Sequence, residues 1–160
     1  MPKKNDSTNA TYKHIDMVFS NLSRFSSELL MRGHLHDRSK LFPPEKADFD
    51  KYTPNLKKIK YNSAAYKKSL LNMKDCLAHH YSVSDHHPEH FDKVDDMNLF
   101  QLVEMFCDWC ASAKRSKDGD IYKSLKYNRK RFKIPKSIYN LMKNTADVFC
   151  KPKRKTNRKQ

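Results

Sequence analysis

The chain has 160 residues, about the size of one domain and enough to bury a core. It is strongly basic, with a formal net charge of +15, and it contains only two glycines. So few glycines exclude glycine-rich phosphate loops and turn-dense β folds. No apolar run approaches the roughly 20 residues that span a bilayer, and the N-terminus has no apolar signal segment. We therefore expect a cytoplasmic protein without a membrane partner.

The chain contains four cysteines, which we expect to be reduced. Cys107 and Cys110 form a single CxxC, and no second pair lies at the spacing of a zinc ribbon. They fall in a helical pattern, where residues three apart share a face. We therefore interpret them as small core residues rather than as metal ligands.

The first long pattern predicts a helix from about residue 8 to residue 32, because Val18, Leu22, Phe25 and Leu29 recur at helical spacing. Gly33 follows, which is a residue type that often ends a helix. His14 lies one turn before Val18, so it extends the same stripe. Two interpretations of His14 stay open, a core residue and a metal ligand.

The rest of the chain also follows helical periodicity. Pro43-Pro44 permits a new helix start with Glu45 in its first turn, and residues 53–62 are expected to form a connection. Further helices are predicted over residues 63–80, 97–116, 121–131 and 136–149, with an aperiodic loop between the first two. The expected fold class is therefore all-α, a single bundle of five to six helices over residues 1–150. The basic residues 151–160 are expected to form a disordered tail.

Apart from His14, the histidines gather in two short stretches, "RGHLHDRSK" at residues 32–40 and "HHYSVSDHHPEH" at residues 79–90. Imidazole is the commonest metal ligand in proteins, and carboxylates join it when the metal is hard or borderline. His36 and Asp37 offer one nitrogen and one oxygen from adjacent residues. The spacing indicates a divalent-metal site, although polar loop residues without a ligand remain an alternative.

These stretches resemble a known group of proteins. A histidine, a His-Asp pair and a distant aspartate on an all-α scaffold are similar to the HD-domain metal-dependent phosphohydrolase superfamily. More closely, "HDRSK", "HHYSVSDHHPEHF", "MNLFQLVEMFCDW", "YKSLKYNRKRFKI" and "LMKNT" resemble, in this order, an uncharacterised HD-like family of unknown function. That family is found largely in phages and bacteria, so a phage protein would act in the host cytoplasm. The resemblance covers residues 12 to 146.

The resemblance implies one divalent ion, of Mn, Fe, Co, Ni, Mg or Zn, held by four residues: His14, His36, Asp37 and Asp108. A second ion would be bound by His80 with His86 or His87. Asp37, Lys40 and His80 would then be catalytic, with Asp37 orienting or deprotonating a water. Lys40 stands where many nucleotidase-type members carry a glutamate, so it would instead orient a phosphate. His86 and His87 are alternatively expected to bind that phosphate.

The helical pattern disagrees with the resemblance about Asp108. At about 100° per residue, Asp108 lies roughly 160° from the centre of the apolar stripe of its helix. Gln101 and Glu104 share this polar side. The pattern predicts a solvated carboxylate, whereas the resemblance implies a metal ligand.

Two functions of different classes follow. The first is a metal-dependent phosphohydrolase acting on a nucleotide or another phosphorylated small molecule. The second is a non-enzymatic nucleic-acid-binding protein, because residues 114–136 hold ten basic and two acidic residues and residues 151–160 hold six basic ones. Its phosphate contacts would be Lys114, Arg115, Lys117, Lys123, Lys126, Arg129, Lys130, Arg131 and the tail. The tail is equally well explained as a solubilising segment.

Overall fold

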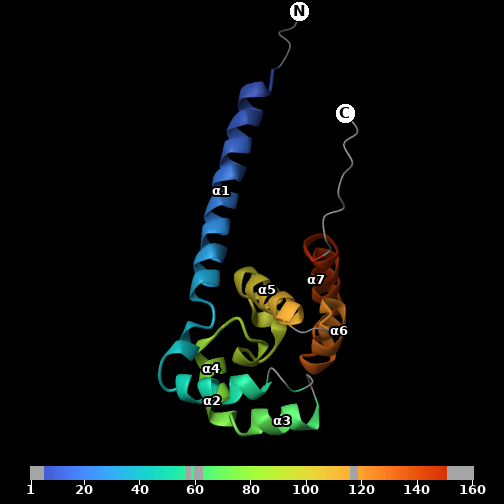
Figure 1. Cartoon of the computed structure of the whole chain (residues 1–160). Helices are drawn as coiled ribbons and strands as arrows, with labels where there is room; N and C mark the ends of the chain where they lie inside the picture. Colours follow the sequence, from blue (N-terminus) through green and yellow to red (C-terminus); the bar gives the residue numbers. More distant parts are fainter. Residues whose placement is uncertain (1–5, 57–58, 60–62, 116–118, 151–160) are drawn as a thin grey trace, which may run out of the picture. The chain divides into compact units, whose positions relative to one another are not determined.

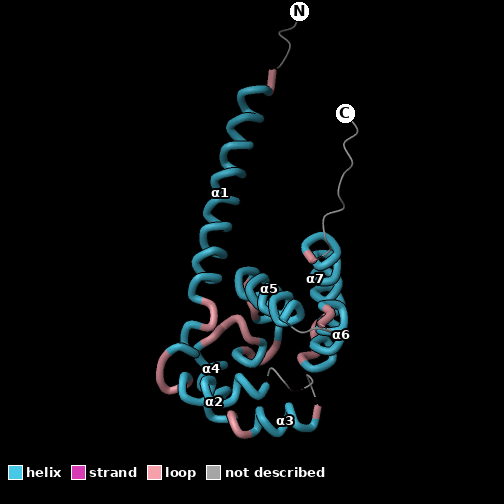
Figure 2. The backbone as a smooth tube through the Cα atoms, viewed as in Figure 1, coloured by secondary structure: helices cyan, strands magenta, loops and turns pink. Residues whose placement is uncertain are grey.

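The structure is a computed structural model that describes residues 6–56, 59, 63–115 and 119–150, and all regular elements in these ranges are helical (Figures 1 and 2). The all-α prediction is confirmed, with seven α-helices in the described ranges instead of five or six. The chain divides into two compact units, Met1–His36 and Asp37–Gln160. The expected single domain over residues 1–150 did not include this division, and the expected tail lies outside the described residues.

The first unit consists of one helix, α1 (Thr8–Leu35). It is longer than predicted because it continues through Gly33, where an added side chain would meet nothing within 4 Å. A glycine within a helix weakens it without ending it. His36 is the C-cap residue. Since the unit is a single helix, its apolar stripe has no partner helix within the unit, and α1 has no buried residue.

The second unit begins with a short 3-10 helix, η1 (Arg38–Leu41), and three α-helices: α2 (Lys46–Leu56), α3 (Ala64–Leu71) and α4 (Lys74–Val83). The helix predicted from residue 63 to 80 is thus two helices, with Asn72 and Met73 between them. Ser63 caps α3, because its hydroxyl accepts a hydrogen bond from the Tyr66 N–H. α2 continues across Pro54 into the expected connection.

A second group of helices follows: α5 (Leu99–Arg115), α6 (Ile121–Arg131) and α7 (Lys136–Phe149). The bounds of α6 and α7 agree with those predicted. α6 packs against both α5 and α7, as Figure 1 shows. Two 3-10 turns, η2 (Pro88–His90) and η3 (Val94–Asp96), lie in the loop between α4 and α5. The main apolar core consists of Val94, Met105, Phe106, Trp109, Cys110, Ile121, Leu125, Ile134, Met142 and Ala146.

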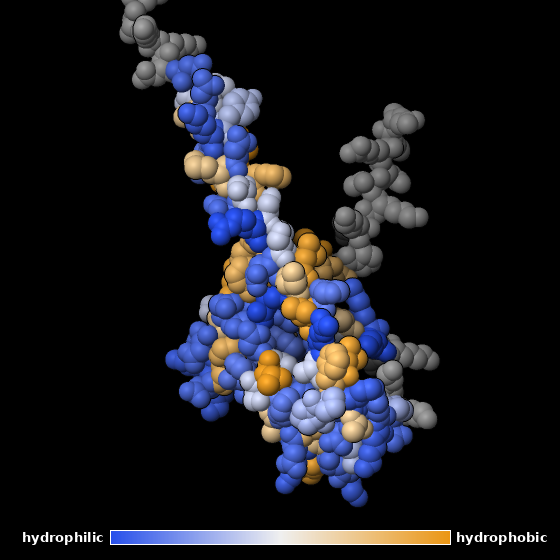
Figure 3. All heavy atoms as spheres, turned by 90° about the vertical axis from the view of Figure 1, so that its left-hand side faces the viewer, coloured by the Kyte–Doolittle hydropathy of each residue, from blue (hydrophilic) through white to orange (hydrophobic). Residues whose placement is uncertain are grey.

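The surface of the second unit is mostly polar. On the face shown in Figure 3, hydrophilic side chains predominate and apolar ones form separate patches. Among the described residues, no helix combines the length and the apolar character required to cross a membrane.

Candidate metal centre

Four potential metal ligands from separate parts of the second unit meet at one point. Asp37, His80, His86 and His87 each place one ligand atom within 4.8 Å of the others. Asp37 precedes η1, His80 lies in α4, and the other two lie in the loop after α4. Asp37 adopts a left-handed backbone conformation with φ of 59°. Aspartate tolerates this conformation better than most residues, which helps to explain its presence at this turn.

The ligand atoms are close enough to share one ion. Nε2 of His80 lies 2.9 Å from Nε2 of His87 and 3.3 Å from Oδ1 of Asp37. Nε2 of His86 lies 3.6 Å from the same carboxylate oxygen. His80 and His86 are buried, whereas Asp37 and His87 are half-buried. The group, which we call the His–Asp cluster, therefore keeps access to solvent through Asp37 and His87.

A buried carboxylate contacts the ring nitrogen of His80 that points away from the cluster. Glu45 is fully buried, and its Oε2 lies 2.9 Å from Nδ1 of His80, while its Oε1 lies 2.8 Å from Nδ1 of His79. The Ser39 hydroxyl donates a hydrogen bond to Glu45 Oε2 over 2.9 Å. An ionised carboxylate only accepts hydrogen bonds, so His80 carries its proton on Nδ1. Nε2 of His80 is therefore the ring nitrogen that faces the His–Asp cluster.

The same arrangement recurs at His86. Its Nδ1 lies 3.2 Å from Oε1 of Glu104, a buried residue of α5. The start of α5 is secured by a reciprocal capping box between the backbone N–H groups and side chains of Asn98 and Gln101. Gln101 also donates a hydrogen bond to Asp85 beside His86. Carboxylates behind the distal nitrogens of ligand histidines are a usual feature of protein metal sites.

Lys40 holds the remaining oxygen of Asp37. Its Nζ donates to Oδ2 over 2.6 Å and lies 4.8 Å from the centroid of the Phe49 ring. Burial opposes ionisation of Asp37, but hydrogen bonds from His80 and His86 and the Lys40 ammonium outweigh it and hold the pKa of that carboxyl well below its usual range. Asp37 is therefore an anion with Oδ1 turned toward the imidazoles.

His87 is uncharged at neutral pH. Burial, followed by the positive charges available to His86 and His80, lowers the pKa of His87 to about 3. The nearby Asp108 carboxylate acts in the opposite direction without reversing this shift. Metal ions bind the neutral form of imidazole, so His87 is in its ligand form.

Two of the four residues that the resemblance implies as ligands of one ion, His14 and His36, are separated by most of the length of α1. α1 is continuous, so at a rise of about 1.5 Å per residue His14 lies about 30 Å from His36, and one ion cannot bind both. Instead, Asp37 meets His80, His86 and His87, which sequence reasoning had assigned to a second ion or to phosphate.

Asp108 lies near the His–Asp cluster without belonging to its converging atoms. It is half-buried on α5, and its Oδ1 accepts a hydrogen bond of 3.4 Å from the Ser112 hydroxyl. The polar side of α5 does not face solvent as the pattern predicted, because Glu104 and Gln101 contact the histidine-rich loop. The predicted exposure of this polar side to solvent is therefore wrong, because the side packs against a polar site.

Sequence reasoning missed the two carboxylates behind the histidines. Glu45 was explained as an acidic residue in the first turn of a helix, and Glu104 as part of a solvated side. Glu104 stands one turn before Asp108 on the same side of the helix, and this spacing was the available signal. No local signal marks Glu45 as a partner of the histidines, because His79 and His80 lie more than thirty positions along the chain.

Comparison with known proteins identifies the family of the chain, and this family has no assigned activity. No curated protein and no solved structure matches the chain. One family model matches residues 3–154, nearly the whole chain, and it describes a family of unknown function, DUF5662. The helical chain that carries the His–Asp cluster therefore belongs to family DUF5662.

Proposed function

We propose that the protein is a metal-dependent phosphohydrolase whose divalent ion is held by Asp37, His80, His86 and His87. The observation that carries the proposal is the convergence of these four ligand atoms, with buried carboxylates behind His80 and His86. The resemblance to the HD-domain superfamily supports the reaction class, although the ligand set differs from the one it implies.

The charge distribution in the His–Asp cluster favours a cation. In their neutral forms His80 and His86 direct lone pairs at the same small volume as the anionic oxygen of Asp37, and without a cation only protons can offset this repulsion. Three imidazoles and one carboxylate suit borderline ions such as Zn, Mn, Fe, Co or Ni. Mg is less suited, because it prefers oxygen ligands and retains several waters.

The half-buried side of the cluster is where a substrate would enter. When bound, a divalent ion supplies Lewis-acid activation of a water and of a phosphoryl oxygen. Lys40 lies beside Asp37 on this side and would attract a phosphate while keeping the carboxylate oriented. Glu45 and Glu104 would hold the imidazoles in position through their Nδ1 protons.

Metal content tests the ligand assignment. We expect the purified full-length protein to bind a transition metal, and Asp37→Asn and His87→Gln to lower its affinity by orders of magnitude, because each removes a ligand. His90→Gln is the matched control, since His90 is exposed in the same loop, its Nδ1 lies 2.8 Å from the Tyr81 carbonyl oxygen, and it does not belong to the His–Asp cluster. Equal metal affinity in folded Asp37→Asn, His87→Gln and the control would place the ion elsewhere.

Hydrolysis tests the reaction class. We expect the metal-loaded protein to cleave p-nitrophenyl phosphate esters or nucleotides in a screen with Mn²⁺, Co²⁺, Ni²⁺, Zn²⁺ and Mg²⁺, with activity lost in Asp37→Asn and retained in His90→Gln. Tight metal binding without turnover of any phosphate ester or anhydride would instead identify a structural metal site and overturn the phosphohydrolase assignment.

A further inference from the structure

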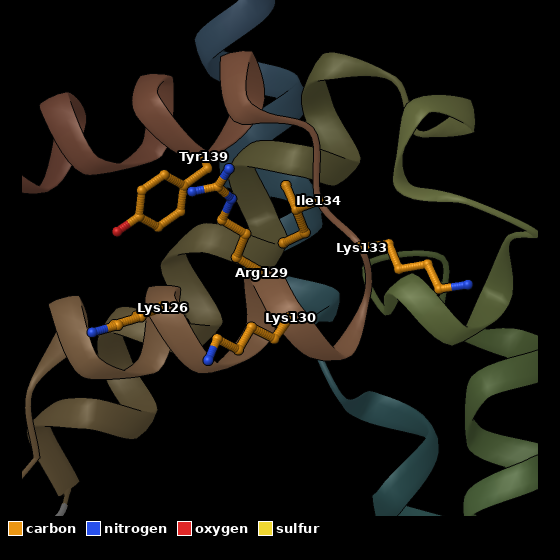
Figure 4. A pocket seen from close by; sticks show the side chains of 6 residues that line it. All are labelled: Lys126, Arg129, Lys130, Lys133, Ile134 and Tyr139. Carbon is orange, nitrogen blue, oxygen red and sulfur yellow. The ribbon is translucent and has the colours of Figure 1, made fainter.

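The second unit carries a strongly basic surface that does not contribute to the His–Asp cluster. Residues 121–136 contain seven basic residues and no acidic one. They form α6, the short connection after it and the first residue of α7, and a pocket of about 510 Å³ opens there. Figure 4 shows the six residues that line this basic pocket: Lys126, Arg129, Lys130, Lys133, Ile134 and Tyr139.

The cations of the basic pocket have no acidic partners in the described part of the chain. No ion pair joins Lys126, Arg129, Lys130 or Lys133 to a described carboxylate, whereas other basic residues are paired, as in the 2.7 Å contact of Arg131 with Glu89. Four neighbouring positive charges repel one another when nothing offsets them. Such a concentration of one sign of charge attracts an anionic partner.

Two lysines of the basic pocket lie on the same side of α6, and an arginine packs against the aromatic ring of Tyr139. Lys126 and Lys130 stand one helical turn apart, about 6 Å along α6, and extend to the same side in Figure 4. Arg129 lies against Tyr139 of α7, with its guanidinium carbon 4.8 Å from the ring centroid. This cation–π contact orients the guanidinium, whose N–H groups remain suited to phosphate oxygens.

We propose that the basic pocket binds the phosphate backbone of a single-stranded nucleic acid. Lys123, outside the pocket, continues the side of α6 that carries Lys126 and Lys130. These three lysines span about 10 Å, so a single phosphate cannot contact all of them. Consecutive phosphates of a strand can. A groove that combines cations with an aromatic side chain is typical of sites that hold single strands with little sequence preference. Tyr139 supplies that aromatic side chain.

Binding of a fluorescein-labelled single-stranded oligonucleotide, measured by anisotropy over a salt series, tests this assignment in the full-length chain. The test variant is Lys126→Gln/Lys130→Gln/Lys133→Gln, whose three positions are all exposed. Glutamine keeps the helix propensity of lysine and removes the charge. We expect at least about a tenfold loss of affinity and a salt dependence, as the slope of log K against log salt, that is shallower by about two.

The matched control is Lys67→Gln/Lys68→Gln/Lys74→Gln, which removes the same charge from exposed positions of α3 and α4. We expect it to bind nearly as well as the wild type. Equal losses in the two variants would mean that net charge alone attracts the strand, and this result, or no binding by the wild type, would overturn the proposal.

Two further probes separate a nucleic acid from other anions. Inorganic pyrophosphate that displaces the strand at equal phosphate concentration would assign the basic pocket to a small phosphate ligand. Pocket-dependent binding to phosphatidylserine vesicles, without binding to the strand, would assign it to a lipid surface. Both outcomes would overturn the proposal. The pocket variant should keep its metal content, because it changes no residue of the His–Asp cluster, so this test is independent of the proposed hydrolase activity.

Discussion

Glu45 is the residue on which the geometry of the His–Asp cluster depends most. It is fully buried and contacts two imidazoles and the Ser39 hydroxyl. A buried carboxylate is costly unless charges or hydrogen bonds compensate it. Glu45 is compensated because His79 and His80 place their Nδ1 atoms at its two oxygens. The two adjacent histidines of α4 therefore both contact the same carboxylate. Of the two, only His80 also belongs to the His–Asp cluster.

Replacing Glu45 by glutamine keeps its shape and removes its charge. Because the charged carboxylate raises the basicity of His80 and fixes its tautomer, we expect Glu45→Gln to lower metal affinity by about 10- to 100-fold. Competition with a chelator measures this change. Asp50→Asn is the control, since its ion pair with Lys46 is exposed and such pairs contribute little. If Glu45→Gln binds metal as tightly as the control, His80 does not depend on Glu45.

The sequence pointed to the individual residues of the His–Asp cluster, but it did not show which of them meet in space. Asp37, His80, His86 and His87 were all candidate site residues, but spacing along the chain gave no reason to join Asp37 to His80, forty-three positions away. The resemblance placed Asp37 with His14 instead. Glu45 was missed because an acidic residue in the first turn of a helix already has a local explanation, the favourable interaction with the helix dipole.

Among the elements, α5 shows the limit of periodicity most clearly. Its apolar side includes Phe106 and Cys110 of the core. Its polar side was expected to face water, yet Glu104 is buried against His86. A periodic pattern identifies the side of a helix that packs on apolar neighbours. It cannot distinguish a side that faces solvent from one that packs on polar residues.

Local end signals explain which helix bounds were predictable. α6 follows Asp120, whose Oδ1 accepts hydrogen bonds from the N–H groups of Tyr122 and Lys123, and α7 follows Pro135. Both residue types are strong start signals, and both helices have the predicted bounds. The break between α3 and α4 carries no proline or glycine, so it was not visible in the sequence.

The turn from α5 to α6 requires Gly119. A Cβ built at this position would lie 1.7 Å from the Ala113 carbonyl oxygen, a backbone atom that cannot move away cheaply. We therefore expect Gly119→Ala to lower the free energy of unfolding by about 1–3 kcal/mol or more, as overpacking does. Urea unfolding followed by circular dichroism measures the change.

Gly33→Ala is the matched substitution with the opposite expectation. Nothing lies within 4 Å of its added Cβ, and alanine is the better helix former by about 0.5–1 kcal/mol. The helical signal of α1 should therefore persist to higher urea concentration. Equal effects of the two substitutions would show that close packing at Gly119 does not constrain the turn.

At the scale of the whole molecule, two stretches of opposite charge have different roles. Residues 85–104 hold six acidic residues and no arginine, and one of them, Glu104, contacts His86 of the His–Asp cluster. All charged residues in the range 121–136 are basic, and this range surrounds the pocket. α5 packs against α6, so one helix connects the two regions. The hydrolase and the nucleic-acid-binding hypotheses, which were alternatives in the sequence, are therefore compatible in the structure.

His14 is where the architecture of the chain and the resemblance to HD domains make opposite predictions. The resemblance makes it a ligand, so His14→Gln should release the metal. The structure places it in the second turn of the continuous helix α1, about 30 Å from His36, while the His–Asp cluster draws all its ligands from the second unit. We therefore expect full-length His14→Gln to keep its metal content and affinity, with His87→Gln losing both in parallel preparations. Elemental analysis and chelator competition measure them. Metal loss from folded His14→Gln would mean that α1 does not stay one unbroken helix in the metal-bound protein, because only a break between His14 and His36 could bring both to one ion.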